Sequence, residues 1–324
     1  MKRQNHSLKS GPLCVRRAFS ALAAVSFGAI FVTGLTSLQG CGGTSGNGAG
    51  GGADRTGSVP ADNEICATIE PTEAQKLEVE GLLIKSPKSR AGGNITIPLY
   101  VHIITTDTGE GDVSDATIAS QVSILNTAYA GGQAPGGYNT SFRFQLISTT
   151  HTANTAWWNA FRDTADERAM KTALRQGTAD DLNIYIKNME GTLGGYGGFP
   201  WNYAADPIMD GPVIRNTCMP GGSNTGYNLG DVAVHEIGHW LGLYHTYQGG
   251  CTNPNDSVSD TPAAAGPNFS CPAPTLDTCT GGQYKGKDPT MNFMDSTPNA
   301  CEYQFTSGQD TRMNSAWTTY RAGK

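Results

Sequence analysis

The stretch from His235 to His245 constrains this chain more than any other, because it reads H-E-x-x-H-x-x-G-x-x-H. Residues four apart lie on one face of a helix, so the imidazoles of His235 and His239 can reach the same ion. Gly242 can take a positive φ and end the helix, so that the chain turns and brings His245 to that ion. Three imidazoles with one open position are typical of a catalytic zinc site. Glu236 is placed to take a proton from a water molecule that the zinc activates.

These histidines could instead be ordinary core residues that bind no metal. The residues between them are mostly apolar and suit a buried helix in either case. However, the chain has only 6 histidines, and half of them fall in this stretch, in register with the glutamate and the glycine. The extended pattern is specific to zinc peptidases, so it favours the catalytic interpretation.

Residues 1–41 have the pattern of an export signal. Basic residues precede an apolar run over residues 18–35. Residues 38–41 then resemble a bacterial lipobox, in which the cysteine, here Cys41, is acylated. An ordinary secretory signal with an incidental cysteine is the alternative. Residues 42–60 are rich in glycine and serine, which is typical of a flexible linker. We expect an exported protein, either a cell-envelope lipoprotein or a secreted, extracellular one, that meets a membrane only through a lipid anchor.

Residues 61–90 are predicted to form a pro-segment. A helical pattern over residues 71–83 is followed by a basic, polar stretch suited to proteolysis. Cys66 precedes that helix. Its thiolate would fill the open coordination position of the zinc and block catalysis, because zinc binds cysteine sulfur tightly. Alternatively, Cys66 is an ordinary structural cysteine.

Residues 91–324 are predicted to form the catalytic domain, with an α/β fold, because strand and helix patterns alternate along them. The expected elements are strands over 95–104, 141–147 and 182–186 and helices over 115–129 and 165–175. Residues 193–200 are rich in glycine and suit a bent edge strand that could bind a peptide through main-chain hydrogen bonds.

After His245 the sequence becomes loop-rich, until a predicted helix over residues 305–320 closes the chain. Four cysteines in this exported segment imply two disulfides, and the sequence alone allows three pairings among Cys251, Cys271, Cys279 and Cys301. Oxygen-bearing side chains alternate over residues 256–261. Asp256, Asp260 and Thr261 could hold a calcium ion, which requires oxygen ligands, or they could form a plain polar turn.

Four motifs together resemble the pappalysin family of metzincin metallopeptidases, and most closely its ulilysin-like microbial branch. They occupy residues 238–246, 258–262, 292–295 and 305–309. The resemblance implies an upper subdomain with a twisted mixed sheet and the zinc helix, and a lower, irregular, disulfide-linked subdomain. It implies that Met294 forms the Met-turn beneath the zinc, that Cys66 is a cysteine switch, and that residues 256–261 bind calcium. By similarity, Cys251 pairs with Cys279 and Cys271 with Cys301.

The sequence departs from the family pattern at three positions. A tyrosine that can assist the oxyanion usually stands two residues after the Met-turn methionine, and here that residue is Ser296. Relatives that cleave before Arg or Lys carry an aspartate where this chain has Asn299, in the specificity pocket. A neutral amide cannot form the same charge-assisted pair, so strict basic specificity is not expected. Cys218 makes the cysteine count of residues 91–324 odd.

We therefore predict an exported zinc endopeptidase, made as a latent precursor, that acts on proteins or peptides as a monomer. The chain has 22 basic and 28 acidic residues, and no basic block beyond the export signal, so nucleic acid is not an expected partner. The alternative from another class is a non-catalytic surface lipoprotein that keeps the zinc site for folding or for binding a partner.

Overall fold

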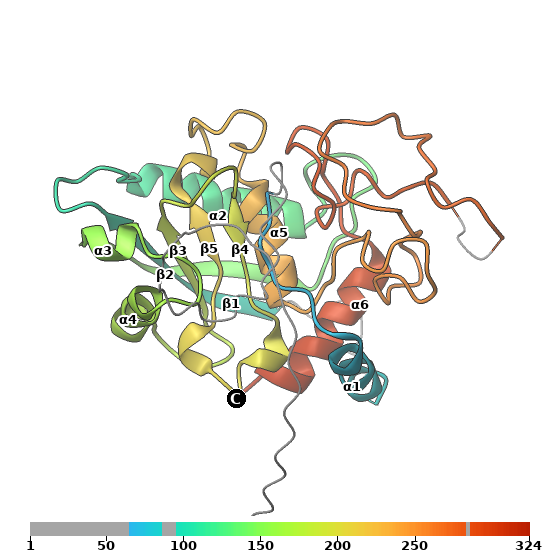
Figure 1. Cartoon of the computed structure of the whole chain (residues 1–324), viewed down its shortest axis with the longest axis horizontal. Coiled ribbons are helices and arrows are strands. Elements are labelled where there is room, and N and C mark those ends of the chain that lie inside the picture. Colours follow the sequence, from blue (N-terminus) through green and yellow to red (C-terminus); the bar gives the residue numbers. More distant parts are fainter. Residues whose placement is uncertain (1–64, 86–94, 283–285) are drawn as a thin grey trace, which may run out of the picture. The chain divides into compact units, whose positions relative to one another are not determined.

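The computed structural model describes residues 65–85, 95–282 and 286–324 (Figure 1). The predicted export signal, Cys41 and the linker at 42–60 lie outside the described residues, as do both ends of the predicted pro-segment. Cys66 and the predicted pro-segment helix lie within them.

A five-stranded sheet with the strand order β2-β1-β3-β5-β4 organises the first half of the fold (Figure 1). Its strands are β1 (Ile95–Thr105), β2 (Phe142–Ala153), β3 (Leu182–Lys187), β4 (Gly195–Tyr196) and β5 (Val213–Arg215). Neighbouring strands are parallel except β4, which runs antiparallel to β5 at the edge of the sheet. The predicted α/β class and mixed sheet are confirmed, although β2 continues beyond its predicted end at residue 147.

Hydroxyl side chains begin most of the helices, because a serine or threonine oxygen can accept a hydrogen bond from a free N–H of the first turn. Thr72, Ser114, Thr164 and Thr306 cap α1, α2, α4 and α6 in this way. The α-helices are α1 (Glu73–Leu83), α2 (Asp115–Tyr129), α3 (Thr155–Trp158), α4 (Ala165–Leu174), α5 (Asp231–Trp240) and α6 (Ser307–Ala316). Short 3₁₀ turns occupy Pro200–Asn202, Pro207–Met209 and Asn216–Cys218, and a π-helix over Trp317–Arg321 continues α6. No helix in the described part of the chain has the length and apolar character needed to span a membrane.

Different helices cover the two faces of the sheet. On one face, α2 and α5 pack on apolar residues such as Leu99 and Ile184. On the other, α3 and α4 pack through Trp158 and Met170 against Tyr185. Every residue of β3 is buried as a result, and most of them are apolar; Asn183 and Lys187 are the exceptions. Because α5 also contacts β4, the histidine-bearing helix runs beside the open edge of the sheet.

Between α5 and α6 the described residues form no helix or strand beyond a single bridge from Asn292 to Gln304. This irregular half lies to one side of the sheet (Figure 1). Two disulfides close it, and they join Cys251 to Cys279 and Cys271 to Cys301. This is the pairing that the family resemblance implies, and each disulfide limits the conformations open to the unfolded loop.

The three residues suggested for calcium already have other partners. The carboxylate of Asp256 accepts hydrogen bonds from the hydroxyl of Thr261 and the amide of Val258. Asp260 instead accepts from Thr306, Ser307 and Gly308 at the N-terminus of α6, where a helix favours negative charge. These contacts give each carboxylate a structural role, so the calcium prediction gains no support.

Candidate active site

The turn after α5 brings three imidazoles together. Gly242 has φ of 98°, a left-handed conformation that ends the helix, and the amide of Leu243 bonds back to the carbonyl of Gly238 at 2.9 Å. As a result, Nε2 of His239 lies 3.1 Å from Nε2 of both His235 and His245. The predicted convergence of the three side chains is therefore present in the structure.

Main-chain carbonyls orient two of these rings. Nδ1 of His235 lies 2.6 Å from the carbonyl oxygen of Phe293, and Nδ1 of His239 lies 2.8 Å from that of Leu243. Because a carbonyl can only accept, each Nδ1 carries the proton, and each Nε2 presents a lone pair to the centre of the group. Lone pairs this close repel one another unless a cation lies between them.

Cys66 completes this group from the predicted pro-segment. Its Sγ lies 3.6 Å from Nε2 of His239, and the ligand atoms of the four side chains all lie within 4.8 Å of one another. Burial and the nearby charge of Glu236 raise the pKa of the Cys66 thiol. A divalent cation opposes both effects and stabilises the thiolate. Three imidazoles and one thiolate are a donor set that suits tetrahedral zinc, so the residues present fit the metal.

The segment that carries Cys66 is held along the edge of the sheet. The amide of Gly194 bonds to the carbonyl of Ile65 at 2.8 Å, and the amide of Ala67 bonds to the carbonyl of Gly195 at 3.0 Å. The segment around Cys66 runs parallel to the edge strand at Gly195. The guanidinium of Arg162 also donates to the carbonyl of Ala67. The predicted pro-segment therefore uses main-chain groups at the β4 edge that an added peptide strand would need.

Glu236 is fully buried beside the metal group. Its Oε2 accepts a hydrogen bond of 2.9 Å from the hydroxyl of Thr68. Its Oε1 has no hydrogen-bond partner among the described residues. Burial raises the pKa of Glu236 to about 8, although the hydrogen bond from Thr68 acts in the opposite direction. The hydroxyl of Thr68 in the predicted pro-segment thus occupies one oxygen of this buried carboxyl group.

Met294 packs directly beneath α5. Its side chain is completely buried, and a Cβ added at Gly238 would lie only 2.4 Å from its sulfur. The carbonyl of Met294 accepts from the amide of Thr246, one residue after the last histidine, at 3.1 Å. The turn predicted to lie under the metal therefore lies under the helix and is tied to the end of the histidine stretch.

A small cavity opens next to His235 and Glu236. It is lined by Ile65, Cys66, Tyr227, Val232, His235, Glu236, Asp295, Ser296, Thr297, Asn299 and Glu302. Asn299 accepts a hydrogen bond from the amide of Leu229 at 3.1 Å and donates one to Glu302 Oε1 at 2.9 Å. Burial holds the pKa of Glu302 well above its ordinary value. Nothing in the sequence around Glu302 indicates that its side chain turns inward, so it was not among the predicted site residues.

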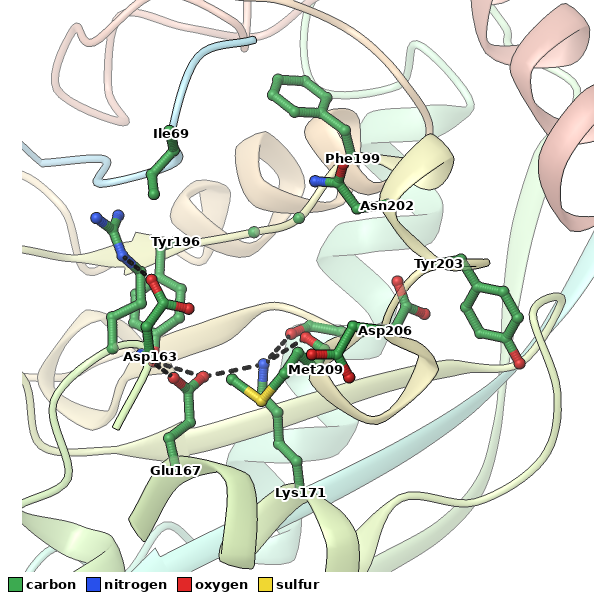
Figure 2. A pocket seen from close by; sticks show the side chains of 15 residues that line it. Ile69, Asp163, Glu167, Lys171, Tyr196, Phe199, Asn202, Tyr203, Asp206 and Met209 are labelled. Atoms are coloured by element: carbon green, nitrogen blue, oxygen red, sulfur yellow. Dashed lines mark hydrogen bonds and ion pairs between the residues drawn. The ribbon is translucent and has the colours of Figure 1, made fainter. Parts of the chain in front are cut away.

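A second cavity, of about 150 Å³, lies beside Tyr196 of β4 (Figure 2). Ile69 of the predicted pro-segment reaches its rim, while Glu167 and Lys171 of α4 form its floor. Glu167 pairs with Lys171 at 3.0 Å and accepts from the hydroxyl of Tyr196 at 2.9 Å. The lysine also donates to two main-chain carbonyls. Since these buried charges are mutually satisfied, they hold α4 against the edge strand.

The predicted pro-segment makes further contacts beyond those of Cys66 and Thr68. The carboxylate of Glu70 accepts from Gln248 at 2.7 Å and lies 3.5 Å from Nδ1 of His245. Helix α1 packs beside α6 (Figure 1), where Glu80 forms an ion pair of 2.8 Å with the buried Arg312. Cys218 takes no part in the metal group, and its buried sulfur accepts a hydrogen bond from Asn224.

Comparison with known proteins identifies the family. The family description "Pregnancy-associated plasma protein-A", of the M43 peptidases, matches residues 168–318. An extracellular metalloprotease of Pyricularia oryzae is 39% identical over 285 residues, which are 84% of this chain and 95% of that protein. The chain belongs to the pappalysin family of zinc metalloendopeptidases. Extracellular metalloprotease 1 of Coccidioides posadasii is 38% identical, over 82% of this chain and 92% of its own length.

Solved pappalysin-like structures show the same fold. A promirolysin mutant of Tannerella forsythia superposes with a TM-score of 0.66 at 27% identity, over 80% of this chain and 95% of its own. Mature mirolysin of the same organism, in complex with a cleaved peptide, gives 0.59 at 28% identity, over 71% of this chain and 96% of its own. The metzincin-type fold predicted from the motifs is confirmed by this similarity.

Proposed function

We propose that this pappalysin is made as an exported, latent precursor, and that Glu236 is the general base of the mature enzyme. The observation that carries the proposal is the closed group of Cys66 with His235, His239 and His245, beside a buried carboxylate. Export is supported by the names of the fungal relatives, which are described as extracellular metalloproteases. A lipid anchor at Cys41 remains part of the proposal.

In the proposed mechanism, zinc held by the three histidines would polarise the scissile carbonyl and lower the pKa of the attacking water. Glu236 takes a proton from that water as it attacks and passes it to the nitrogen of the leaving amine. The edge strand β4 holds the substrate backbone in line with the site through its amides and carbonyls. Substrate can bind there only after residues 65–69 have left.

In this proposal, two contacts at the reacting centre keep the precursor latent. Cys66 takes the position of the water, and Thr68 holds the base by its Oε2. The similarity to promirolysin covers more of this chain than the similarity to the mature enzyme does, 80% against 71%, as a shared pro-segment would produce.

Incubation of the purified precursor with zinc is expected to remove the pro-segment, with cleavage in the basic stretch at residues 85–90. A chelator should stop this trimming, and returning zinc should restore it, because the reaction depends on the metal. Gel electrophoresis and mass spectrometry of the products measure both. Trimming that continues at the same rate in the presence of the chelator would argue against self-processing. No trimming and no substrate cleavage with zinc bound would favour the non-catalytic surface lipoprotein.

We also propose that the cavity lined by Asn299 receives the side chain that follows the scissile bond. Without a carboxylate at residue 299, we expect a peptide-library profile without strict preference for Arg or Lys. Asn299→Asp should raise the share of cleavage before basic residues by about tenfold, since a charge-assisted pair replaces a neutral contact. Asn159→Asp, which adds the same charge at an exposed position, is the control. If the unaltered enzyme instead cleaves predominantly before Arg or Lys, then Glu302 would supply the negative charge that binds their side chains.

A further inference from the structure

The serine at position 296 leaves the proposed reaction without an obvious hydrogen-bond donor for the developing oxyanion. Such donors often supply a large part of the stabilisation of an acyl-transfer transition state. The structure offers a candidate two residues beyond the last histidine. Tyr247 lies parallel to His245, with ring centroids 4.7 Å apart and an interplanar angle of 11°. This stacking fixes the plane of the phenol against one of the proposed metal ligands.

The hydroxyl of Tyr247 contacts Ser296, the residue that stands where the family usually has a tyrosine. It lies 3.0 Å from Oγ of Ser296, and Ser296 lines the cavity that also contains Cys66 and Glu236. The main chain of Ser296 is fixed in turn, because its amide donates to Asp295 and its carbonyl accepts from Tyr227. The phenol therefore approaches the metal group from the irregular half of the fold.

Ser296, the hydrogen-bond partner of Tyr247, lines the same small cavity as Cys66. The Sγ atom of Cys66 occupies the open side of the histidine group. That atom must leave before a scissile carbonyl can take its place.

The hydroxyls of Tyr247 and Ser296 together carry one more O–H donor than the hydrogen bond between them uses. Tyr247 and Ser296 each carry one O–H, and the bond between them uses one proton whichever residue donates. Neither hydroxyl makes another hydrogen bond within the described residues. One proton of the pair is therefore free for a third oxygen.

We propose that Tyr247 is a catalytic residue, whose hydroxyl donates a hydrogen bond to the oxyanion formed when water adds to the scissile carbonyl. The hydroxyl of Ser296 then donates its hydrogen bond to the oxygen of Tyr247 and keeps the phenol in place. The proposal rests on the proposed function and deepens it. In this proposal Tyr247, which follows the histidine stretch, takes the role that the tyrosine after the Met-turn methionine has in the family.

Tyr247→Phe keeps the ring on His245 and removes only the hydroxyl. We expect kcat of the processed enzyme to fall by about 10²-fold with little change in KM, because the lost contact exists only in the transition state. Bound zinc and Tm should stay at the values of the unaltered protein. Affinity for a phosphinic peptide, which mimics the tetrahedral oxyanion, should fall by at least about tenfold when measured by calorimetry.

Two further variants test the assignment. Adding Ser296→Tyr to Tyr247→Phe returns a phenol from the other side and should restore part of the lost kcat. Tyr100→Phe, on β1, controls for the loss of a phenol hydroxyl elsewhere. Unchanged kcat and inhibitor affinity in Tyr247→Phe would overturn the inference, and so would a loss that merely follows lost zinc or a lowered Tm. Inhibitor affinity can be measured without turnover, so absence of cleavage by the unaltered enzyme would refute only the proposed function.

Discussion

Replacing Glu236 with glutamine is expected to reduce peptide hydrolysis by about 10²–10⁴-fold, the usual contribution of a general base. Glutamine has nearly the same shape and should occupy the same buried position. It cannot take a proton from water at neutral pH. The fall should therefore appear in kcat, measured on a fluorogenic peptide after a second protease has removed the pro-segment, because the variant is not expected to process itself.

Metal binding should survive this change. The Nδ1 atoms of His235 and His239 are oriented by main-chain carbonyls of Phe293 and Leu243, not by Glu236. Zinc content by atomic absorption and Tm are therefore expected to match the unaltered enzyme. Hydrolysis within a few-fold of the original rate, with zinc bound, would remove Glu236 from the mechanism.

The sequence was most informative where chemistry depends on fixed spacing. Two histidines one helical turn apart and a glycine that can end the helix predict three converging imidazoles, and the structure brings the Nε2 atoms to 3.1 Å. Alternating strand and helix patterns likewise predicted β1, α2, β2, α4 and β3 in their order along the chain. Both patterns depend only on residues that are close together in the sequence, so they can be predicted without knowledge of the fold.

Contacts between distant segments were harder to predict. Thr68 meets Glu236 and Tyr247 meets Ser296 only because the edge strand and the irregular half close on α5 from different sides. Glu302 was missed for the same reason, since its inward position depends on how the loop before α6 is folded. The calcium site stays a prediction. Oxygen-bearing side chains close in sequence pointed to it, and in the structure Asp260 accepts hydrogen bonds from Thr306 and Gly308 at the N-terminus of α6.

Replacing Cys66 with alanine is expected to give a precursor with activity close to that of the processed enzyme. The change removes the only sulfur in the described metal group and leaves the position open to water. Main-chain bonds from Ile65 and Ala67 to the edge strand would remain, as would the hydrogen bond from Thr68 to Glu236. These contacts bind weakly without the thiolate, so substrate should displace the segment.

Cys218 provides a matched control, because it is the second free cysteine among the described residues and is also buried. Cys218→Ala should leave the precursor latent, which separates loss of the Cys66 sulfur from loss of any thiol. Activity on a fluorogenic peptide, measured in the first minutes before self-processing, compares the two variants with the unaltered precursor. If Cys66→Ala stays as inactive as Cys218→Ala, then the strand contacts and Thr68 hold the precursor shut, and the thiolate is not the switch.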